Sequence, residues 1–353
     1  MSRLRFVVCG TTFGRVHLAA LGTDPPWGRL VGVLARGSGR SVSVARAAGV
    51  PLYQEVDDLP TGVDAAVVAV RGAVAGGRGT DLATALMDRG IHVLQEHPLH
   101  HDELASCLRT ARRNRVVYRV NNHYLHLTPI RRLVAATAAL SRHGPIRYLD
   151  AGTGIQVAYA LVDILARVLP SLRPWRLAPP VATEPPGVAP IRGVDGVIGG
   201  VPVGIRVHNE LDPGDPDNHA HLLHRLAVIT DAGTLTLADT HGPVLWSPRL
   251  HVVDGGDPAG ERYLRQPTTR TLPGTEPTDY ATVLRVAWPT AMAAAMADFA
   301  VAVASGDDPL RLGQTQLTVC RLWQDLTSRL GQPDLITGTP PPLITDELTE
   351  LAA

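Results

Sequence analysis

Short apolar runs alternate with segments of helical periodicity through the first third of the chain. The predicted strands lie at residues 4–9, 30–35, 65–70, 91–94 and 116–120, and the predicted helices at residues 14–21, 42–48, 81–89 and 102–114. The run at 65–70 is apolar throughout, as is typical of a strand buried on both faces. Strands and helices that alternate at this spacing predict parallel βαβ units, and so an α/β fold.

The pattern changes in the remaining two thirds of the chain. We expect helices at residues 129–141, 157–169, 281–305 and 314–330, and antiparallel strands within residues 194–211 and 222–237. Residues 174–190 are rich in proline, which predicts irregular structure, and Pro289 predicts a break in its helix. Asp231-Ala232-Gly233 is a hairpin-turn signal. This part of the chain therefore predicts an α+β arrangement with an open, mainly antiparallel sheet.

Composition narrows the possible partners and chemistry. The chain has 353 residues, 45% hydrophobic and 19% charged, with a formal net charge of +0. A neutral chain has no broad field for nucleic acid or an anionic membrane, so we expect neither as a partner. No lysine occurs, which excludes a lysine general acid and a Schiff base. Three widely spaced cysteines, no uncharged apolar run of about 18 residues and no signal-peptide pattern predict a cytoplasmic protein.

The turn after the first predicted strand suits the pyrophosphate of a dinucleotide. It consists of Gly10, Thr11, Thr12, Phe13 and Gly14, and it opens a predicted helix. The N–H groups at a helix N-terminus can bind phosphate, and glycines let the backbone approach it closely. An ordinary strand–helix turn is the alternative, because the full three-glycine pattern is absent.

The end of the second predicted strand indicates which dinucleotide is bound. A carboxylate normally follows this strand and takes the ribose 2′-hydroxyl of NAD. Here the sequence offers Arg36, Ser38, Arg40 and Ser41 instead. Guanidinium and hydroxyl groups suit a 2′-phosphate, so we predict NADP(H) as cofactor. A solvated basic loop is the alternative.

Two later strand ends carry candidate acid–base residues. Glu96 and His97 follow the strand at 91–94, and Tyr124 follows the strand at 116–120. If these strands are neighbours in a parallel sheet, both groups emerge at the same carboxyl edge, where an open α/β sheet presents its chemistry. For each residue the alternative is structural: His97 would only shape the turn before Pro98, and Tyr124 would be a core aromatic.

Several of these stretches resemble the Gfo/Idh/MocA oxidoreductases, and in particular their thiazolinyl imine reductases of siderophore assembly lines of the yersiniabactin and pyochelin type. The resembling stretches are residues 10–14, 35–41, 74–80, 95–100, 212–225 and 240–250. In most of the family the strand-end turn reads Glu-Lys-Pro and a later aspartate is followed four positions on by histidine. Here these positions hold His97 and, after Asp163, Arg167, which counts against sugar dehydrogenation.

The resemblance implies a fold, an activity and partners. It implies a Rossmann NADP-binding domain over residues 1–122 and a substrate-binding and oligomerisation domain over residues 123–353 with an open sheet. The implied reaction is the NADPH-dependent reduction of a thiazoline C=N to a thiazolidine, on an intermediate tethered to a peptidyl carrier protein of a nonribosomal peptide synthetase. A homodimer is implied as well. An NADP-dependent oxidoreductase acting on a sugar or other small carbonyl, and a non-catalytic NADP-binding sensor, are the competing functions.

Site residues follow from both lines of reasoning. The imine nitrogen must gain a proton, and His97 and Tyr124 are the candidate catalytic residues, Tyr124 because it matches a tyrosine proposed as the family's acid. We also assign Arg71, Glu96 and His97 to the cofactor site. Residues 215–221 and His224 contain several possible metal ligands, but no metal is expected, because no cysteine joins them and hydride transfer needs no metal.

Overall fold

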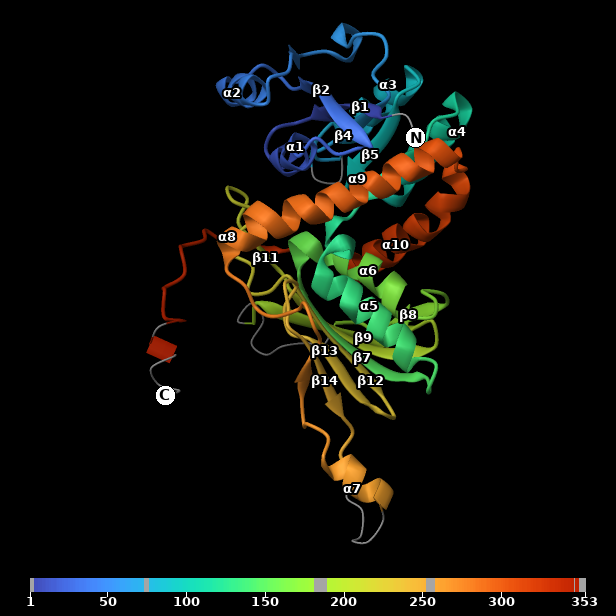
Figure 1. The fold of residues 1–353 in the computed structure, drawn as a ribbon, viewed down its shortest axis with the longest axis vertical. Coiled ribbons are helices and arrows are strands. Elements are labelled where there is room, and N and C mark those ends of the chain that lie inside the picture. Colours follow the sequence, from blue (N-terminus) through green and yellow to red (C-terminus); the bar gives the residue numbers. More distant parts are fainter. Residues whose placement is uncertain (1–2, 73–75, 181–188, 252–257, 346, 349–353) are drawn as a thin grey trace.

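A computed structural model describes residues 3–72, 76–180, 189–251, 258–345 and 347–348. A six-stranded sheet lies at one end of the molecule and an eight-stranded sheet at the other, with helix α9 (Trp288–Ser305) running between them (Figure 1). Val74 and Ala75 of the resembling stretch 74–80, and residues 181–188 of the stretch predicted to be irregular, fall outside the described residues.

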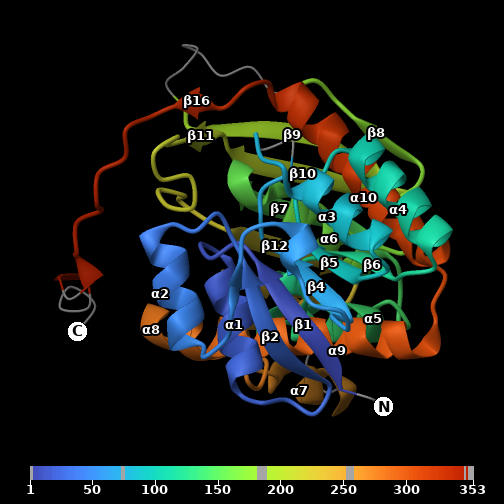
Figure 2. The same ribbon diagram turned by 90° about the horizontal axis from the view of Figure 1, so that it is seen from above.

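The first sheet is parallel throughout, in the order β3-β2-β1-β4-β5-β6. Its strands are β1 (Leu4–Cys9), β2 (Gly28–Leu34), β3 (Leu52–Tyr53), β4 (Ala65–Val68), β5 (His92–Glu96) and β6 (Tyr118–Asn121). They are connected by α1 (Gly14–Gly22), α2 (Gly39–Ala47), the short helix η1 (Val56–Asp58), α3 (Gly79–Asp88) and α4 (His101–Asn114). The predicted Rossmann-like arrangement is confirmed. Seen from above, its strands lie in front of the second sheet (Figure 2).

The second sheet has the order β15-β14-β13-β12-β7-β10-β9-β8. Its strands are β7 (Ile146–Gly154), β8 (Trp175–Leu177), β9 (Ile191–Ile198), β10 (Val201–His208), β12 (His224–Thr230), β13 (Gly233–Leu237), β14 (Val244–Pro248) and β15 (Arg270–Thr271). Every neighbouring pair is antiparallel except β7 with β10. The prediction of an open, mainly antiparallel sheet is therefore confirmed. A separate pair joins β11 (Glu210–Leu211) to β16 (Asp334–Leu335) in parallel.

Strand β7 was not predicted, although it lies at the centre of the second sheet. Its second half reads Asp150-Ala151-Gly152-Thr153-Gly154, and glycine and aspartate are poor strand formers. Tertiary pairing with β10 and β12 on either side outweighs that local preference. Strand β8 likewise lies inside the proline-rich stretch 174–190 that was predicted to be irregular, so that prediction was wrong for Trp175–Leu177.

The remaining helices cover the second sheet and join the two parts. They are η3 (His123–His126), α5 (Thr128–Leu140), η4 (Ile155–Val157), α6 (Ala158–Val168), α7 (Pro258–Leu264), α8 (Tyr280–Thr282), η5 (Val283–Ala287), α9 and α10 (Pro309–Leu330). Pro289 stands in the first turn of α9, directly after a π-helical turn. Proline cannot donate the helical hydrogen bond, which accounts for the irregular turn at the predicted break.

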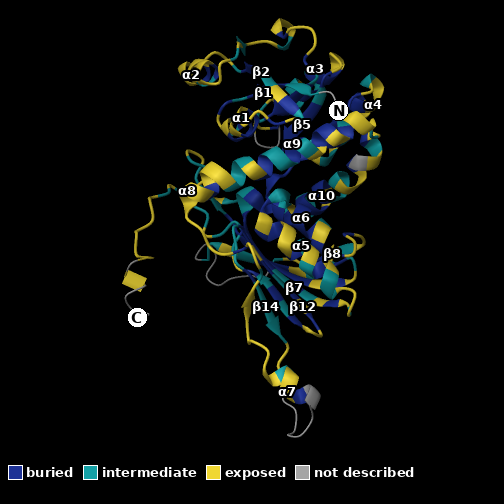
Figure 3. Cartoon of the chain, viewed as in Figure 1, coloured by how far each residue is buried: buried dark blue, intermediate teal, exposed yellow. Residues whose placement is uncertain are grey.

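Helix α9 packs against the first sheet although it belongs to the last third of the chain. Its Met292, Met296 and Phe299 are fully buried in a cluster with Phe6 and Val8 of β1. Figure 3 shows this buried face on a helix whose other face is exposed. Within the described residues one helical stretch, Tyr280–Ser305, is apolar and long enough to cross a membrane by composition alone. Its packing against β1 is a sufficient reason for that composition.

Candidate active site

A cleft of about 2600 Å³ lies between the carboxyl edge of the first sheet and the part of the molecule that contains the second sheet. Its walls come from the ends of β1, β2 and β5, from η3 and η4, and from α10. Among the residues assigned from sequence, those that line the cleft are Gly10, Thr11, Thr12, Phe13, Arg36, Ser38, Ser41, Arg71, Glu96, His97 and Tyr124. The structure thus brings together most of the proposed cofactor residues and both proposed catalytic residues.

The turn after β1 has the geometry that a bound phosphate requires. Gly10 has a φ of +89°, and a Cβ there would lie 2.7 Å from the carbonyl oxygen of Ala69, so only glycine fits. No side chain caps the start of α1, which leaves the first N–H groups of that helix open to an anion. Gly14 does not line the cleft; it packs against β1, where a Cβ would lie 3.1 Å from Val8.

The polar side chains that follow β2 differ in their contacts. Arg36 is exposed, lines the cleft and forms no hydrogen bond or ion pair with another described residue. Ser38 is the N-cap of α2 and accepts the N–H of Ser41 at 3.3 Å, while the Ser41 hydroxyl donates to the Ser38 carbonyl at 2.8 Å. Ser41 is buried, so it holds the loop in place. Arg40 does not line the cleft.

Carboxylates also line this part of the cleft, which was not predicted from the sequence. Glu55, Asp57 and Asp58 belong to the segment that follows β3, and all three line the cleft. The prediction of NADP(H) rested on the end of β2, but β3 pairs with β2 and brings its own following turn to the same edge. Arg71, which is exposed, lines the same cleft.

Glu96 is at the centre of a buried cluster of polar side chains. Nε2 of His17, from α1, lies 2.9 Å from one carboxylate oxygen, and Nδ2 of Asn121 donates to the same oxygen. Burial acts to raise the pKa of Glu96, but the hydrogen bond from His17 and the nearby histidines outweigh it and lower that pKa. Glu96 is therefore a carboxylate at neutral pH. No pattern in the sequence indicated His17, because it lies on a helix far from Glu96 along the chain.

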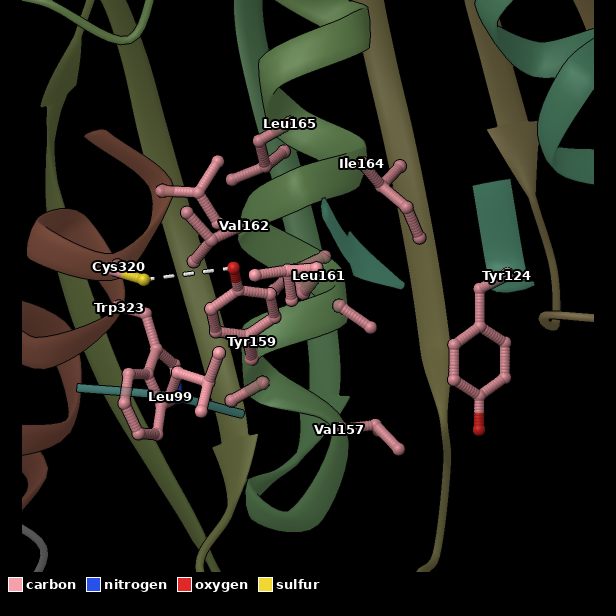
Figure 4. Packing of buried hydrophobic residues seen from close by; sticks show 14 of the residues in the cluster. Leu99, Tyr124, Val157, Tyr159, Leu161, Val162, Ile164, Leu165, Cys320 and Trp323 are labelled. Atoms are coloured by element: carbon pink, nitrogen blue, oxygen red, sulfur yellow. Dashed lines mark hydrogen bonds between the residues drawn. The ribbon is translucent and has the colours of Figure 1, made fainter. Parts of the chain in front are cut away.

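The ring of His97 is held on two sides. Its Nδ1 lies 2.8 Å from the carbonyl oxygen of Asn121, and its ring stacks on Tyr159 with centroids 5.2 Å apart and planes 20° apart. Tyr159 is anchored in turn by the contact of its hydroxyl with Cys320 at 3.7 Å (Figure 4). Because a carbonyl oxygen only accepts, Nδ1 must carry a proton. The other ring nitrogen, Nε2, is then the one that can exchange a proton with a bound molecule.

Tyr124 is held by a chain of polar contacts from the neighbouring elements. The side-chain oxygen of Asn122 accepts the N–H of Tyr124 at 3.2 Å, and the Asn122 amide donates to the buried Asp163 at 3.2 Å. The Tyr124 ring makes an edge contact with His224, with centroids 4.8 Å apart. Figure 4 shows its hydroxyl extending away from the backbone. No hydrogen bond joins this hydroxyl to another described residue. Burial raises the pKa of Tyr124, so it stays protonated at neutral pH.

Two further histidines near the cleft, His123 and His224, have structural surroundings. His123 is packed among Phe13, Tyr124 and Trp288, and burial lowers its pKa to about 3. His224 is bonded to Thr240 and Val157, and burial lowers its pKa to about 4. Both rings are therefore neutral at pH 7. Trp288, at the start of α9, packs against this cluster. No local motif in the sequence indicates that contact.

Comparison with known proteins adds a family to this geometry. Residues 4–122 match the model of the GFO_IDH_MocA oxidoreductase family with an NAD-binding Rossmann fold, and residues 146–247 match the C-terminal model of Irp3-like thiazolinyl imine reductases. No protein of curated function matches the chain. The chain is an oxidoreductase with an NAD-binding Rossmann domain. Residues 4–122 are similar to the Gfo/Idh/MocA oxidoreductases, and residues 146–247 are similar to the C-terminal domain of Irp3-like thiazolinyl imine reductases.

Solved structures of the same fold include a 3-ketoreductase, a UDP-N-acetylglucosamine 3-dehydrogenase and a further oxidoreductase. KijD10, a 3-ketoreductase from Actinomadura kijaniata solved with NADP and TDP-benzene, is 17% identical, with 95% of this chain and 100% of that chain covered and a TM-score of 0.68. UDP-N-acetylglucosamine 3-dehydrogenase GnnA from Acidithiobacillus ferrooxidans is 16% identical, with 93% and 98% covered and a TM-score of 0.64. An oxidoreductase from Agrobacterium radiobacter, in complex with NAD+, L-tartaric acid and magnesium, is 12% identical, with 92% and 95% covered and a TM-score of 0.67. At these identities the likeness is one of fold.

Proposed function

We propose that this chain is an NADPH-dependent thiazolinyl imine reductase. It would reduce a thiazoline C=N to a thiazolidine in an intermediate tethered to a peptidyl carrier protein of a nonribosomal peptide synthetase. The observation that carries the proposal is the match of residues 146–247 to the imine reductase C-terminal model. It is supported by His97 and Tyr124, which line one cleft with the turn at Gly10. The domain division at residue 122 belongs to the same proposal.

The residues of the first sheet fit a dinucleotide with a 2′-phosphate. The turn from Gly10 to Phe13 and the open start of α1 would hold the pyrophosphate. Arg36, beside the hydroxyl of Ser38, would bind the 2′-phosphate, because its guanidinium is exposed to the cleft and has no described protein partner. When bound, the reduced nicotinamide supplies the hydride that the reaction requires.

Residues that follow β5 and β6 would supply the proton. Reduction of the C=N places a negative charge on nitrogen unless a proton arrives, and a protonated imine accepts hydride more readily. At neutral pH the Tyr124 hydroxyl is a donor, because burial raises its pKa. Nε2 of His97 donates only when the ring is protonated, because Nδ1 is already committed to Asn121. Either residue, or both through a water molecule, would protonate the imine nitrogen.

The decisive experiment uses a synthetic thiazoline thioester and the purified enzyme. Loss of absorbance at the reduced-nicotinamide band, together with a thiazolidine product two mass units heavier, is expected with NADPH. Polyols and aldoses are offered with NADP in parallel. Robust oxidation of a sugar without thiazoline turnover would favour the small-carbonyl alternative. Tight NADPH binding without any turnover of either substrate class would favour a sensor.

The expected homodimer is tested separately. Exposed apolar side chains gather on α8, η5 and α9, including Tyr280, Leu284, Val286 and Val301. These side chains are the candidate contact between two copies. Light scattering after size exclusion should give twice the mass of the 37.6 kDa chain. A monomer at micromolar concentration would contradict the expectation.

A further inference from the structure

Three side chains of the kinds that bind metal ions lie close to one another around β11. His208 ends β10, Glu210 belongs to β11, and His221 lies in the loop between β11 and β12. One ligand atom from each residue lies within 4.8 Å of the other two. Nε2 of His208 is 3.2 Å from Glu210 Oε2, and the two imidazole rings meet edge to face with centroids 4.7 Å apart.

We propose that His208, Glu210 and His221 bind one Zn²⁺ ion, with water completing the coordination. Two imidazoles and one carboxylate are a common donor set for tetrahedral zinc. Bonds of about 2.1 Å at the tetrahedral angle put neighbouring ligand atoms about 3.4 Å apart. The 3.2 Å separation of His208 and Glu210 is close to that value. His221 is exposed, so its side chain can close the remaining distance by a rotamer change.

The chain does not satisfy His208 by itself. Its side chain is 1% exposed, and its Nδ1 is buried without a hydrogen-bond partner among the described residues. Nε2, which faces Glu210, would ligate the ion, and Nδ1 would carry the proton of the neutral ring. The other histidines of this region have different partners. His224 is bonded to Thr240 and Val157, and Nε2 of His219 lies 3.4 Å from Asp215.

The position of the ion indicates its role. The loop that carries His221 also carries Pro216 and Asp217, which line the cleft. Glu210 lies on β11, which pairs with β16, and Figure 2 shows these two strands side by side at the edge of the molecule. An ion at this point would fasten the cleft loop to the second sheet and to the C-terminal segment. It would be a structural ion and would take no part in hydride transfer, so the proposal stands independently of the proposed function.

The proposed ligands differ from the residues that the sequence pattern indicated. The sequence directed attention to residues 215–221 with His224, a grouping that the fold separates. His208 and Glu210 precede that loop and have no recognisable metal spacing with it. Only the end of β10 and the return of the loop bring them together.

The test measures zinc directly on untagged protein that has been treated with EDTA and dialysed. Titration with ZnCl₂ followed by calorimetry, and elemental analysis after gel filtration, should give one equivalent per chain. His221→Ala and Glu210→Gln should each weaken zinc binding by at least about 100-fold, the upper end of the loss seen when even outer-shell partners are removed. His143→Ala, which removes an exposed histidine on a loop after α5, should bind zinc like the wild type.

Thermal unfolding gives a second, independent measurement. Zinc should raise the Tm of the wild type and of His143→Ala by several degrees, and should leave that of His221→Ala unchanged. Because His208 is buried, the test uses only the two more accessible ligands. Absence of saturable zinc binding at micromolar concentration would overturn the proposal. So would stoichiometric binding that His221→Ala and Glu210→Gln both retain.

Discussion

The carbonyl oxygen of Asn121 lies 2.8 Å from Nδ1 of His97, and this contact fixes the chemistry that His97 can perform. The carbonyl requires a proton on Nδ1, so a neutral His97 presents a bare Nε2 to the cleft. Asn121 is itself held, because its side-chain amide donates to Glu96 across the paired strands β5 and β6. The orientation of His97 therefore depends on pairing within the first sheet.

The first prediction concerns the role of His97 in turnover. If His97 donates the proton from Nε2, His97→Gln should lower kcat by about 100-fold, because the amide is not a general acid. The measurement is kcat with saturating NADPH and thiazoline, with NADPH titration as the control for intact cofactor binding. A wild-type kcat in His97→Gln would assign the proton to another group.

The second prediction concerns cofactor choice. Arg36→Ala should raise the Kd for NADPH by roughly 10- to 100-fold, because a charge-assisted hydrogen bond is worth about 1.5–3 kcal/mol. The Kd for NADH should stay within about twofold. Arg40→Ala is the matched control, because Arg40 carries the same charge outside the cleft lining. Fluorescence titration gives all of these constants. Equal binding of NADH and NADPH by the wild type would refute the assignment.

The third prediction concerns acid stability. Burial lowers the pKa of His123 to about 3, whereas an unfolded histidine titrates near 6.5. The unfolded state therefore binds more protons, and stability falls as the pH drops below about 6.5. At pH 5 this one residue should cost about 2 kcal/mol of the free energy of unfolding relative to pH 8.

His123→Phe is the variant that isolates this effect. Both ring nitrogens of His123 lack a hydrogen-bond partner among the described residues, and its neighbours are aromatic, so phenylalanine suits the site. Denaturant unfolding at pH 8 and pH 5 should show a smaller loss in His123→Phe than in the wild type. His143→Ala, which removes an exposed histidine, should behave like the wild type. Equal losses in wild type and His123→Phe would show that His123 does not titrate on unfolding.

How far the sequence could lead is visible in particular residues. The ends of β5 and β6 could be predicted to meet, because parallel strands share a carboxyl edge, and Glu96, His97 and Tyr124 do line one cleft. The contact of His17 with Glu96 could not be predicted. It depends on the packing of α1 against the sheet, and a lone histidine on an apolar helix face gives no signal.

The second sheet shows the same limit. Its hairpin β12–β13 follows from alternation and from the turn Asp231-Ala232-Gly233. The central strand β7 does not, because Gly152 and Gly154 contribute no strand preference and their pairing partners are far away in sequence. The carboxylates after β3 could not be predicted to line the cleft either, because only the pairing of β3 with β2 brings them to the edge where Arg36 lies.

The last prediction separates the two candidate proton donors. Tyr124→Phe removes only a hydroxyl that bonds to no described residue, so the fold and NADPH affinity should be kept while kcat falls by about 100-fold. If Tyr124 alone supplies the proton, His97→Gln should keep a kcat close to that of the wild type. If His97 supplies it instead, Tyr124→Phe should keep a kcat close to that of the wild type.

The double variant Tyr124→Phe/His97→Gln decides whether the two residues act together. Independent donors give losses that add as free energies, and residues that act as one unit give a double loss close to the larger single loss. We expect the second result, because both residues face one cleft and only one proton is needed at the imine nitrogen. NADPH titration of each variant is the control for intact binding. Full kcat in the double variant, with cofactor bound normally, would remove both side chains from the chemistry and leave substrate positioning as the source of catalysis.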